Sequence, residues 1–540
     1  MKTFALLLLM LITCSVTLYA QCKVEVPVAT TSVNGSGILP GDTICLEAGN
    51  RDYLYFSQIK GSEANPIVIV NKAGTVTIDT DHFFGIKFSQ CEHLKLIGIP
   101  TNQSLYGFQI IRVSGGAGIT IDEMSQGIEI AYAEIAHTKI GGIYAKTDPD
   151  CSFIATREKF LFNGLKIHHC YLHDIADEGF YIGSSKYTGQ QLPDCDTTVL
   201  PHLIHNVYIH DNLVERTGWD GIQVSSSPVN CFIYNNVIIN DSEKETPNQM
   251  SGILIGGGSD CDCYNNKIFD GKGDGIDVFG FGEMKIYNNL IVRAGKSFQP
   301  EINTAYRHGI FIGNAPDNAA VRLKIMHNTI ISPKSTGVKI FNTSTSNHLF
   351  FNNLITNPGS FNLEGDAAYL NLSGNQLNIS VKNNLFSEHP ENIGFVSFDV
   401  DNFDLKPGSR AVNAGFEAGL NKVIFDIENR PRPHNNGFDI GAFECQDVFA
   451  GLGEPGIDPE LTVFPNPAST SVFVALNNVN HQPKDISLTK LNGKLVKVFN
   501  YSSLSSKFHL DLQGIADGLY LIQVITAEKT YHKKLQIIQP

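Results

Sequence analysis

Short segments of alternating apolar and polar residues recur along most of the chain, and many of them open on a Gly followed by an apolar residue. Strict alternation over a few residues is typical of a half-buried β-strand, and no apolar spacing of helical period lies between these segments. The pattern therefore predicts an all-β protein. The recurring segments are GIYA at 142, GFYI at 179, GIQV at 221, GILI at 252, GIDV at 275, GIFI at 309 and GVKI at 337.

A second sequence motif, which ends in Asn, alternates with the Gly-initiated segments along the chain. Its members run from Asn212 to Asn384 in six intervals of 23 to 39 residues, about 29 on average. Repeats of this kind stack on one another as a solenoid, and we expect the equivalent Asn side chains to form a hydrogen-bonded ladder. The phrases are HDN at 210–212, YNN at 234–236, 264–266 and 287–289, HN at 327–328, FNN at 351–353 and KNN at 382–384.

These strands, turns and intervals resemble the right-handed parallel β-helix of the pectate-lyase-like superfamily, over residues 21–445. The segments LPGDTICLEAGN at 39–50 and GSEANPIVIVNKAG at 61–74 look like the opening coils of secreted β-helix proteins. FDLKPGSRAVNAG at 403–415, NRPRP at 429–433 and FDIGAFE at 438–444 resemble the terminal segment of bacterial surface β-helix proteins. We expect this segment to cap the open end of the solenoid, where exposed strand edges would otherwise invite association.

The C-terminal part contains a different pattern. After a linker at 446–460, alternating strands with Asn-Gly and Asp-Gly turns predict a small β-sandwich over 461–540. LTVFPNPASTSVFVAL at 461–476 and GLYLIQV at 518–524 are similar to the type A sorting domain of the type IX secretion system of Bacteroidota. The resemblance implies the secretion machinery as a partner, passage across the outer membrane, removal of about the last 80 residues, and a secreted or surface-attached product.

Residues 1–20 read as a signal peptide, with Lys2, an apolar run and Ala20 before the cleavage site. No later stretch approaches the ~20 apolar residues of a membrane span. Export permits disulfides, whose connectivity the sequence leaves open; Cys22 with Cys45 and Cys151 with Cys195 are two candidate pairs.

Composition and charge limit the classes of molecule that the protein is expected to bind. Only 17% of the residues are charged, against roughly 25% in a typical protein, while the chain has 45 Asn and 49 Gly. The segment from Leu461 has eight Lys and four acidic residues, so residues 21–460 carry a net charge of −19. Without a basic cluster we expect no nucleic-acid partner, and an anionic polysaccharide must approach against the overall field. We expect a monomer.

Aligning the Gly-initiated strands predicts one outward stripe, because alternation sends the third residue of each outward. An elongated stripe with tyrosines suits a polysaccharide. The residues that we assign to substrate binding are Tyr144, Glu178, Tyr181, Gln223 and Lys339, and those that we assign to catalysis are Asp220, Asp274, Asp277, Arg307 and His308.

Three kinds of function remain open for this stripe. The carboxylates fit a glycoside hydrolase, which needs one protonated and one ionised carboxyl. Tyr306-Arg307-His308-Gly309 resembles the Arg-His-Gly of polysaccharide lyase family 6, in which such an arginine takes part in catalysis. The rival is a non-catalytic glycan-binding or adhesin-like rod, in which each Asp-Gly is only a turn and Arg307 only pairs with an acid. No metal ligands can be assigned, and a Ca²⁺ requirement stays open.

Overall fold

The computed structural model describes residues 22–299 except 102–103, 306–446 except 343–345, 360–364, 374–376, 418, 420–421 and 435–436, and 461–537 except 467, 469, 477–482, 491–494, 500–506, 517 and 527–529. The predicted signal peptide and the linker from residue 447 lie outside the described residues.

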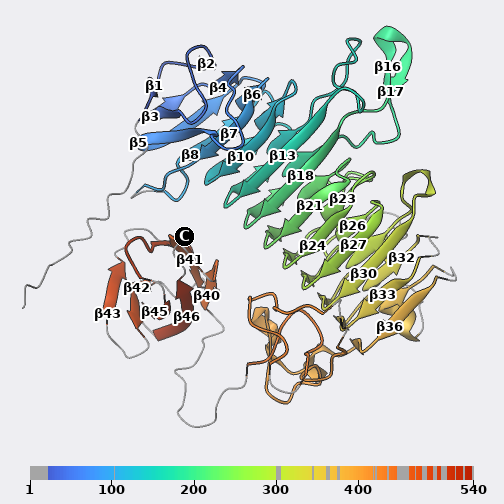
Figure 1. The fold of residues 1–540 in the computed structure, drawn as a ribbon. Coiled ribbons are helices and arrows are strands. Elements are labelled where there is room, and N and C mark those ends of the chain that lie inside the picture. The colour runs from blue at the N-terminus through green and yellow to red at the C-terminus, as the bar shows by residue number, and fades with distance from the viewer. Residues whose placement is uncertain are drawn as a thin grey trace, which may run out of the picture.

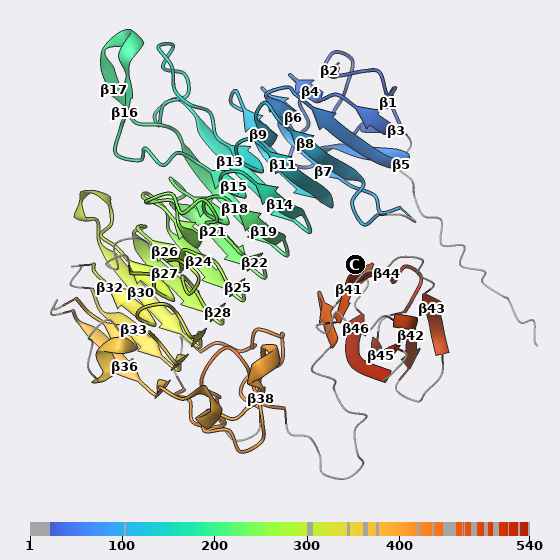
Figure 2. The ribbon, with the colours of Figure 1, turned by 180° about the vertical axis from the view of Figure 1, so that it is seen from behind.

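Strands of successive coils pair in parallel and form three walls around one apolar core (Figures 1 and 2). The long strands β3 and β5 run through the bend from the first wall into the second. The first wall contains β1 (Val24–Val26), β3 (Thr43–Arg51), β5 (Ile67–Thr80), β7 (Glu92–Ile97), β10 (Gln126–Ala131), β13 (Leu161–His168), β18 (Leu203–His210), β21 (Val229–Tyr234), β24 (Cys261–Tyr264), β27 (Gly282–Tyr287), β30 (Val321–Met326), β33 (His348–Phe351) and β36 (Ile379–Lys382). The second wall continues with β8 (Phe108–Val113), β11 (Ala133–Thr138), β14 (Tyr171–Ile175), β19 (Leu213–Thr217), β22 (Val237–Ile239), β25 (Lys267–Phe269), β28 (Leu290–Val292), β31 (Thr329–Ile331), β34 (Leu354–Thr356) and β37 (Leu385–Ser387).

The third wall is built from the Gly-initiated segments. In this wall Ile253 pairs with Ile222 and Ile276, and all three side chains are buried in the core. The Gly before each Ile is required by a close approach, since a Cβ on Gly275 would lie 2.5 Å from the carbonyl oxygen of Gly309. The strands are β2 (Ser32–Asn34), β4 (Leu54–Ser57), β6 (Phe84–Ser89), β9 (Ala117–Asp122), β12 (Ile143–Ala145), β15 (Phe180–Ile182), β20 (Ile222–Val224), β23 (Ser251–Ile255), β26 (Asp274–Val278), β29 (Ile310–Ile312), β32 (Val338–Ile340) and β35 (Leu370–Asn371).

The predicted Asn ladder is confirmed at the bend between the first and second walls. Asn266 donates through Nδ2 to Oδ1 of Asn289 at 3.0 Å and accepts from Nδ2 of Asn236 at the same distance. The residue before each ladder Asn adopts a positive φ, as Asn265 does at 55°, and is Asn, Asp or, at position 327, His, the residue types that tolerate this conformation best. The ladder runs through Asn212, Asn236, Asn266, Asn289, Asn328, Asn353 and Asn384.

An insertion leaves the stack between β15 and β18 (Figure 1). It contains the antiparallel hairpin of β16 (Gln190–Leu192) and β17 (Thr197–Val199), joined by the 3-10 turn η1 (Pro193–Cys195). The predicted disulfide between Cys151 and Cys195 is present and ties this hairpin to the loop after β12. The predicted Cys22–Cys45 pair is also present, and Cys231–Cys261 is a third.

The segment after β37 corrects one expectation, because it does not simply cap the open end of the solenoid. Phe403, Ile440 and Phe443 pack against outward-facing residues of the second wall, including Leu290 and Leu354. The shared apolar surface lies along the side of several coils, and Val381 on β36 stays 47% exposed. The elements of this lateral segment are η4 (Pro390–Asn392), β38 (Phe395–Ser397), η5 (Phe398–Val400) and β39 (Asn402–Leu405), while η2 (Pro316–Asn318) and η3 (Gly365–Ala368) lie in earlier loops.

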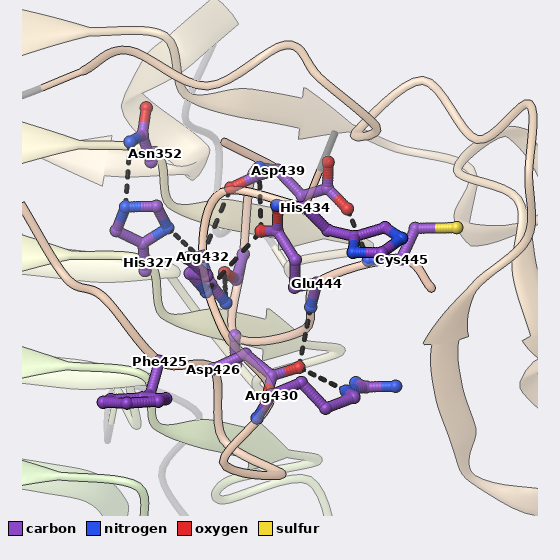
Figure 3. A network of polar contacts seen from close by, with 12 residues as sticks. His327, Asn352, Phe425, Asp426, Arg430, Arg432, His434, Asp439, Glu444 and Cys445 are labelled. Carbon is purple, nitrogen blue, oxygen red and sulfur yellow. Dashed lines mark hydrogen bonds and ion pairs between the residues drawn. The ribbon is translucent and has the colours of Figure 1, made fainter. Parts of the chain in front are cut away.

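A buried polar network joins the lateral segment to the solenoid (Figure 3). Arg432 donates to Nδ1 of His327 and to the carbonyl oxygen of Gly441 at 2.8 Å, and its Nε lies 3.7 Å from Glu444. The Arg432 and Glu444 side chains are both fully buried. The NRPRP and FDIGAFE motifs therefore supply an internal charge cluster that holds the segment in place.

The C-terminal strands form two antiparallel sheets over a separate apolar core, as the predicted β-sandwich requires. One sheet contains β40 (Leu461–Phe464), β41 (Ser471–Leu476) and β44 (Lys507–Asp511), and the other β42 (Pro483–Lys490), β43 (Leu495–Phe499), β45 (Gly518–Thr526) and β46 (Thr530–Ile537).

Candidate functional site

The register of the third wall aligns the predicted stripe in a single outward column. Tyr144 pairs with Tyr181, which pairs with Gln223, and the pairing continues strand by strand to Lys339. Adjacent strands are ~4.8 Å apart, so an extended ligand along this column meets one side chain from each coil. The column is Tyr144, Tyr181, Gln223, Leu254, Asp277, Phe311 and Lys339.

A second row lies beside this column, at the bend where each strand begins. The backbone carbonyl oxygens of its members accept hydrogen bonds from glycines of the preceding coil, for example Asp220 from Gly179 N–H. The row is almost fully buried, with Asp220 and Glu178 each 1% exposed and Asp274 7% exposed. It consists of Glu178, Asp220, Ser251, Asp274, His308 and Thr336.

Asp274 and Asp277 form the centre of an acidic group. Burial, together with the nearby carboxyls of Asp274 and Asp220, raises the pKa of Asp277 well above its usual range. Burial also raises the pKa of Asp274, to about 6, against the opposing influence of Arg307. Asp277 Oδ1 is buried without a hydrogen-bond partner among the described residues. This environment favours the protonated form of Asp277 more strongly than that of Asp274.

Two further carboxyls contribute to this environment. Burial raises the pKa of Asp220 well above its usual range, and its Oδ1 accepts a 2.7 Å hydrogen bond from Ser251 Oγ. Asp241, which the sequence reasoning missed, is buried in the loop after β22, where burial raises its pKa to about 7. Negative charge on either residue favours the protonated form of Asp277.

Arg307 and His308 support the acidic group. Arg307 Nη1 lies 3.7 Å from Asp274 Oδ2, and its guanidinium carbon lies 4.9 Å from the Phe298 ring centroid. The backbone N–H of His308 donates to Asp274 Oδ1. Burial lowers the pKa of the His308 imidazole to about 3, so the ring is neutral, and its Nδ1 lies 2.7 Å from Thr336 Oγ1. The guanidinium is therefore engaged by neighbouring side chains.

The substrate-binding candidates divide into buried and accessible groups. Gln223 is 1% exposed and lies beneath the surface with Glu178. Tyr144 donates a 3.1 Å hydrogen bond to Glu178 Oε2, and burial raises the pKa of Glu178 to about 7. The Tyr144 and Tyr181 ring centroids are 5.2 Å apart, whereas Lys339 Nζ lies 5.5 Å from the Tyr306 ring centroid at the far end of the column.

Beside Tyr181 the wall is hollowed into a groove of about 420 Å³. The groove lies between the third wall and the β16–β17 hairpin. It is lined by Lys146, Asp148, Tyr181, Ser184, Ser185, Lys186, Gly189, Gln190 and Gln191. Sequence alternation placed only Tyr181 here, because the remaining groups come from insertions that interrupt the repeat.

No group of three or more His, Cys, Asp or Glu side chains that could hold a metal ion occurs within the described ranges.

Two family models match the chain. Residues 194–386 match the right handed beta helix region. Residues 462–539 match the secretion system C-terminal sorting domain. The predicted fold class is confirmed, and the sorting domain directs the protein through the type IX secretion system to the cell surface or beyond. Within the part of the chain that the structure describes, no helix has the length and hydropathy to cross a membrane.

No curated protein matches the chain. Among solved structures it is similar to the enzymatically active domain of bacteriophage CBA120 tailspike protein 2, at 11% identity and a TM-score of 0.30, covering 94% of this chain and 66% of that one. It is also similar to the periplasmic alginate epimerase AlgG, at 14% identity and a TM-score of 0.33, covering 67% of this chain and 85% of that one. A third similar structure is a PL6 family polysaccharide lyase from Pseudopedobacter saltans, at 13% identity and a TM-score of 0.32, covering 78% of this chain and 99% of that one. These likenesses concern the fold alone.

Proposed function

We propose that the protein is an exported enzyme that binds a polysaccharide along the third wall and hydrolyses glycosidic bonds at Asp277. The observation that carries the proposal is the pairing of two buried carboxyls on β26: burial raises the pKa of Asp277 well above its usual range, whereas Arg307 and the His308 N–H limit the rise for Asp274. The roles of the stripe residues remain predictions.

The proposed chemistry divides two tasks between two carboxyls. Asp277 points outward from β26 and stays protonated, so it is suited to donate a proton to the glycosidic oxygen. Asp274 is held by the His308 N–H and the Arg307 guanidinium and is suited to act as the ionised partner. The negative charge of ionised Asp274 favours the protonated form of Asp277 by like-charge repulsion.

Elimination, the chemistry of a lyase, has less support from the geometry. It requires a cation that neutralises the carboxylate of a uronate. Arg307 already faces Asp274, donates to Met250 Sδ at 2.9 Å and covers the Phe298 ring. His308 is neutral because burial lowers its pKa to about 3. Arg307 is therefore better described as a positioning residue for Asp274.

The test is incubation of the purified protein with pectins, alginates, glycosaminoglycans and neutral glycans. Hydrolysis gives new reducing ends without unsaturated products, whereas elimination also gives ultraviolet absorbance. Retained binding with no product on any glycan would support the non-catalytic rod and refute the enzyme.

The pH dependence provides a prediction for Arg307→Ala. Arg307 lowers the pKa of both Asp274 and Asp277, so its removal raises both. We expect both limbs of the pH–rate profile to move to higher pH, the acidic limb by about one unit. The measurement is kcat/KM against pH. Arg322→Ala, which removes a first-wall arginine paired with Glu283 at 2.9 Å, should leave both limbs in place, and an unmoved acidic limb in Arg307→Ala would separate Arg307 from the site.

A further inference from the structure

The groove beside Tyr181, which we call the hairpin pocket, is built from two insertions. Lys146 and Asp148 follow β12, whereas Ser184 to Lys186 follow β15 in the insertion that continues through Gly189 into Gln190 and Gln191 of β16. The Cys151–Cys195 disulfide joins the first segment to the hairpin. A crosslink between two walls of a pocket holds its width, so the groove is a preformed feature of the fold.

The charges in the hairpin pocket differ from those of the body around it. Lys146 Nζ lies 2.9 Å from Asp148 and 4.9 Å from the Tyr181 ring centroid, so this cation has two partners. Lys186 is exposed, and no ion pair to it is formed by any described residue. The three charged groups leave a surplus of one positive charge, within a body of net charge −19.

Uncharged polar groups complete the lining. Gln190 Oε1 is buried without a hydrogen-bond partner among the described residues, and the Tyr181 hydroxyl lies 2.8 Å from Ser185 Oγ. Glutamine side chains and hydroxyls bind sugar hydroxyls through hydrogen bonds. The Tyr181 and Ser185 hydroxyls and the glutamine amides therefore offer hydrogen-bonding groups to a hydroxyl-bearing occupant.

We infer that the hairpin pocket is a subsite for a sugar unit that carries an anionic group, a carboxylate or a sulfate ester, with Lys186 binding the anion and Tyr181 lying against the sugar. The inference rests on the proposed function, since it assumes that a glycan lies along the third wall. Tyr181 and Asp277 are three strands apart in the outward column, roughly 14 Å at ~4.8 Å per strand. One extended chain can therefore occupy the pocket and the acidic group together.

This placement separates recognition of the anion from the chemistry. Arg307 is engaged by Asp274 and Phe298, so it is a poor receptor for a substrate carboxylate. Lys186 lies outside the acidic group, so an anion bound there is not repelled by the ionised Asp274 carboxylate. The pocket thus gives the otherwise acidic protein a local site for an acidic glycan.

The test compares Lys186→Ala with a matched control, Lys159→Ala. Lys159 is exposed in the neighbouring loop, outside the pocket lining, and its loss changes the net charge equally. Binding is measured by calorimetry in the Asp277→Asn background, in which we expect cleavage to be about a thousandfold slower. The probes are oligogalacturonate, a sulfated galactan oligosaccharide and a neutral glucan oligosaccharide.

We expect Lys186→Ala to weaken binding of at least one anionic probe about fivefold, and Lys186→Glu to weaken it further. The difference should shrink as salt is added, because exposed charges are screened. Binding of the neutral probe, and all binding by Lys159→Ala, should match the parent. The probe with the larger loss identifies the anion as carboxylate or sulfate.

Three outcomes would overturn the inference: no binding of either anionic probe by the parent, equal binding by all Lys186 variants, or equal losses for Lys159→Ala. These results are distinguishable from failure of the proposed function. Lys186-dependent binding without cleavage by wild type refutes the hydrolase and supports the subsite. Cleavage of a neutral glycan at a rate that Lys186 substitutions do not change supports the hydrolase and refutes the subsite.

Discussion

Asp277→Asn is expected to lower the rate of polysaccharide cleavage by a factor of about a thousand, because a positioned general acid contributes roughly 10²–10⁴ in rate. The amide has nearly the same shape but cannot donate the proton to the leaving oxygen. Burial and the nearby Asp274 carboxyl favour the protonated form of the native Asp277. The substitution therefore removes a proton donor and leaves the net charge of the site nearly unchanged near neutral pH. The measurement is kcat on the glycan that gives product, with binding measured separately.

The pH–rate profile provides a second readout of the same pair. Activity should rise as pH increases through about 6, where Asp274 ionises, and fall at higher pH, where Asp277 loses its proton. Asp262→Asn is the matched control, since this first-wall carboxylate lies 2.8 Å from Lys285 Nζ and outside the stripe. Its activity should stay within twofold of wild type. Wild-type rates in Asp277→Asn would place the proton donor elsewhere.

Arg432→Met is expected to lower the free energy of unfolding by about 3–5 kcal/mol, because removing one partner of a buried ion pair leaves an uncompensated charge. Arg432 and Glu444 are both fully buried, and the guanidinium also donates to His327 on the solenoid and to the Gly441 carbonyl oxygen (Figure 3). Methionine fills a similar volume but leaves these acceptors unpaired. The measurement is chemical denaturation of the purified protein.

Arg410→Met supplies the control for this prediction. Arg410 lies in the same lateral segment but is exposed, and surface substitutions change stability by about 0.5 kcal/mol or less. A similar loss in both variants would mean that the buried network makes no special contribution. The lateral segment should also become accessible to proteases in Arg432→Met, since it packs on the second wall through a shared apolar surface.

Much of the solenoid was predictable because the strands and turns of each coil are determined by short stretches of local sequence. The Gly-initiated segments, the Asn at each bend and the outward column follow from local alternation and turn chemistry. Asn266 and Asp277 were therefore placed correctly in the repeat by counting along the chain. The two candidate disulfides that the structure contains also join residues near the ends of recognisable segments, although the sequence left the connectivity open.

The remaining features depend on contacts between segments that the repeat does not describe. Asp241 lies in an irregular loop, and only the folded structure shows that it is buried near the acidic group. The lateral packing of the segment around Phe443 could not be predicted, because the sequence does not show that Leu290 and Leu354 form an outward apolar surface on the second wall. The hairpin pocket likewise joins residues from two insertions whose partners no periodicity predicts.

The constant register of the third wall fixes the distances between side chains of successive coils in whole strand spacings. Tyr181 and Asp277 are separated by whole strands, so gain or loss of one coil between them changes their spacing by ~4.8 Å and alters neither group. Related chains that differ by a duplicated coil would then select glycans by the interval between the recognised unit and the reacting bond. Specificity for spacing would arise in discrete steps, through repeat number.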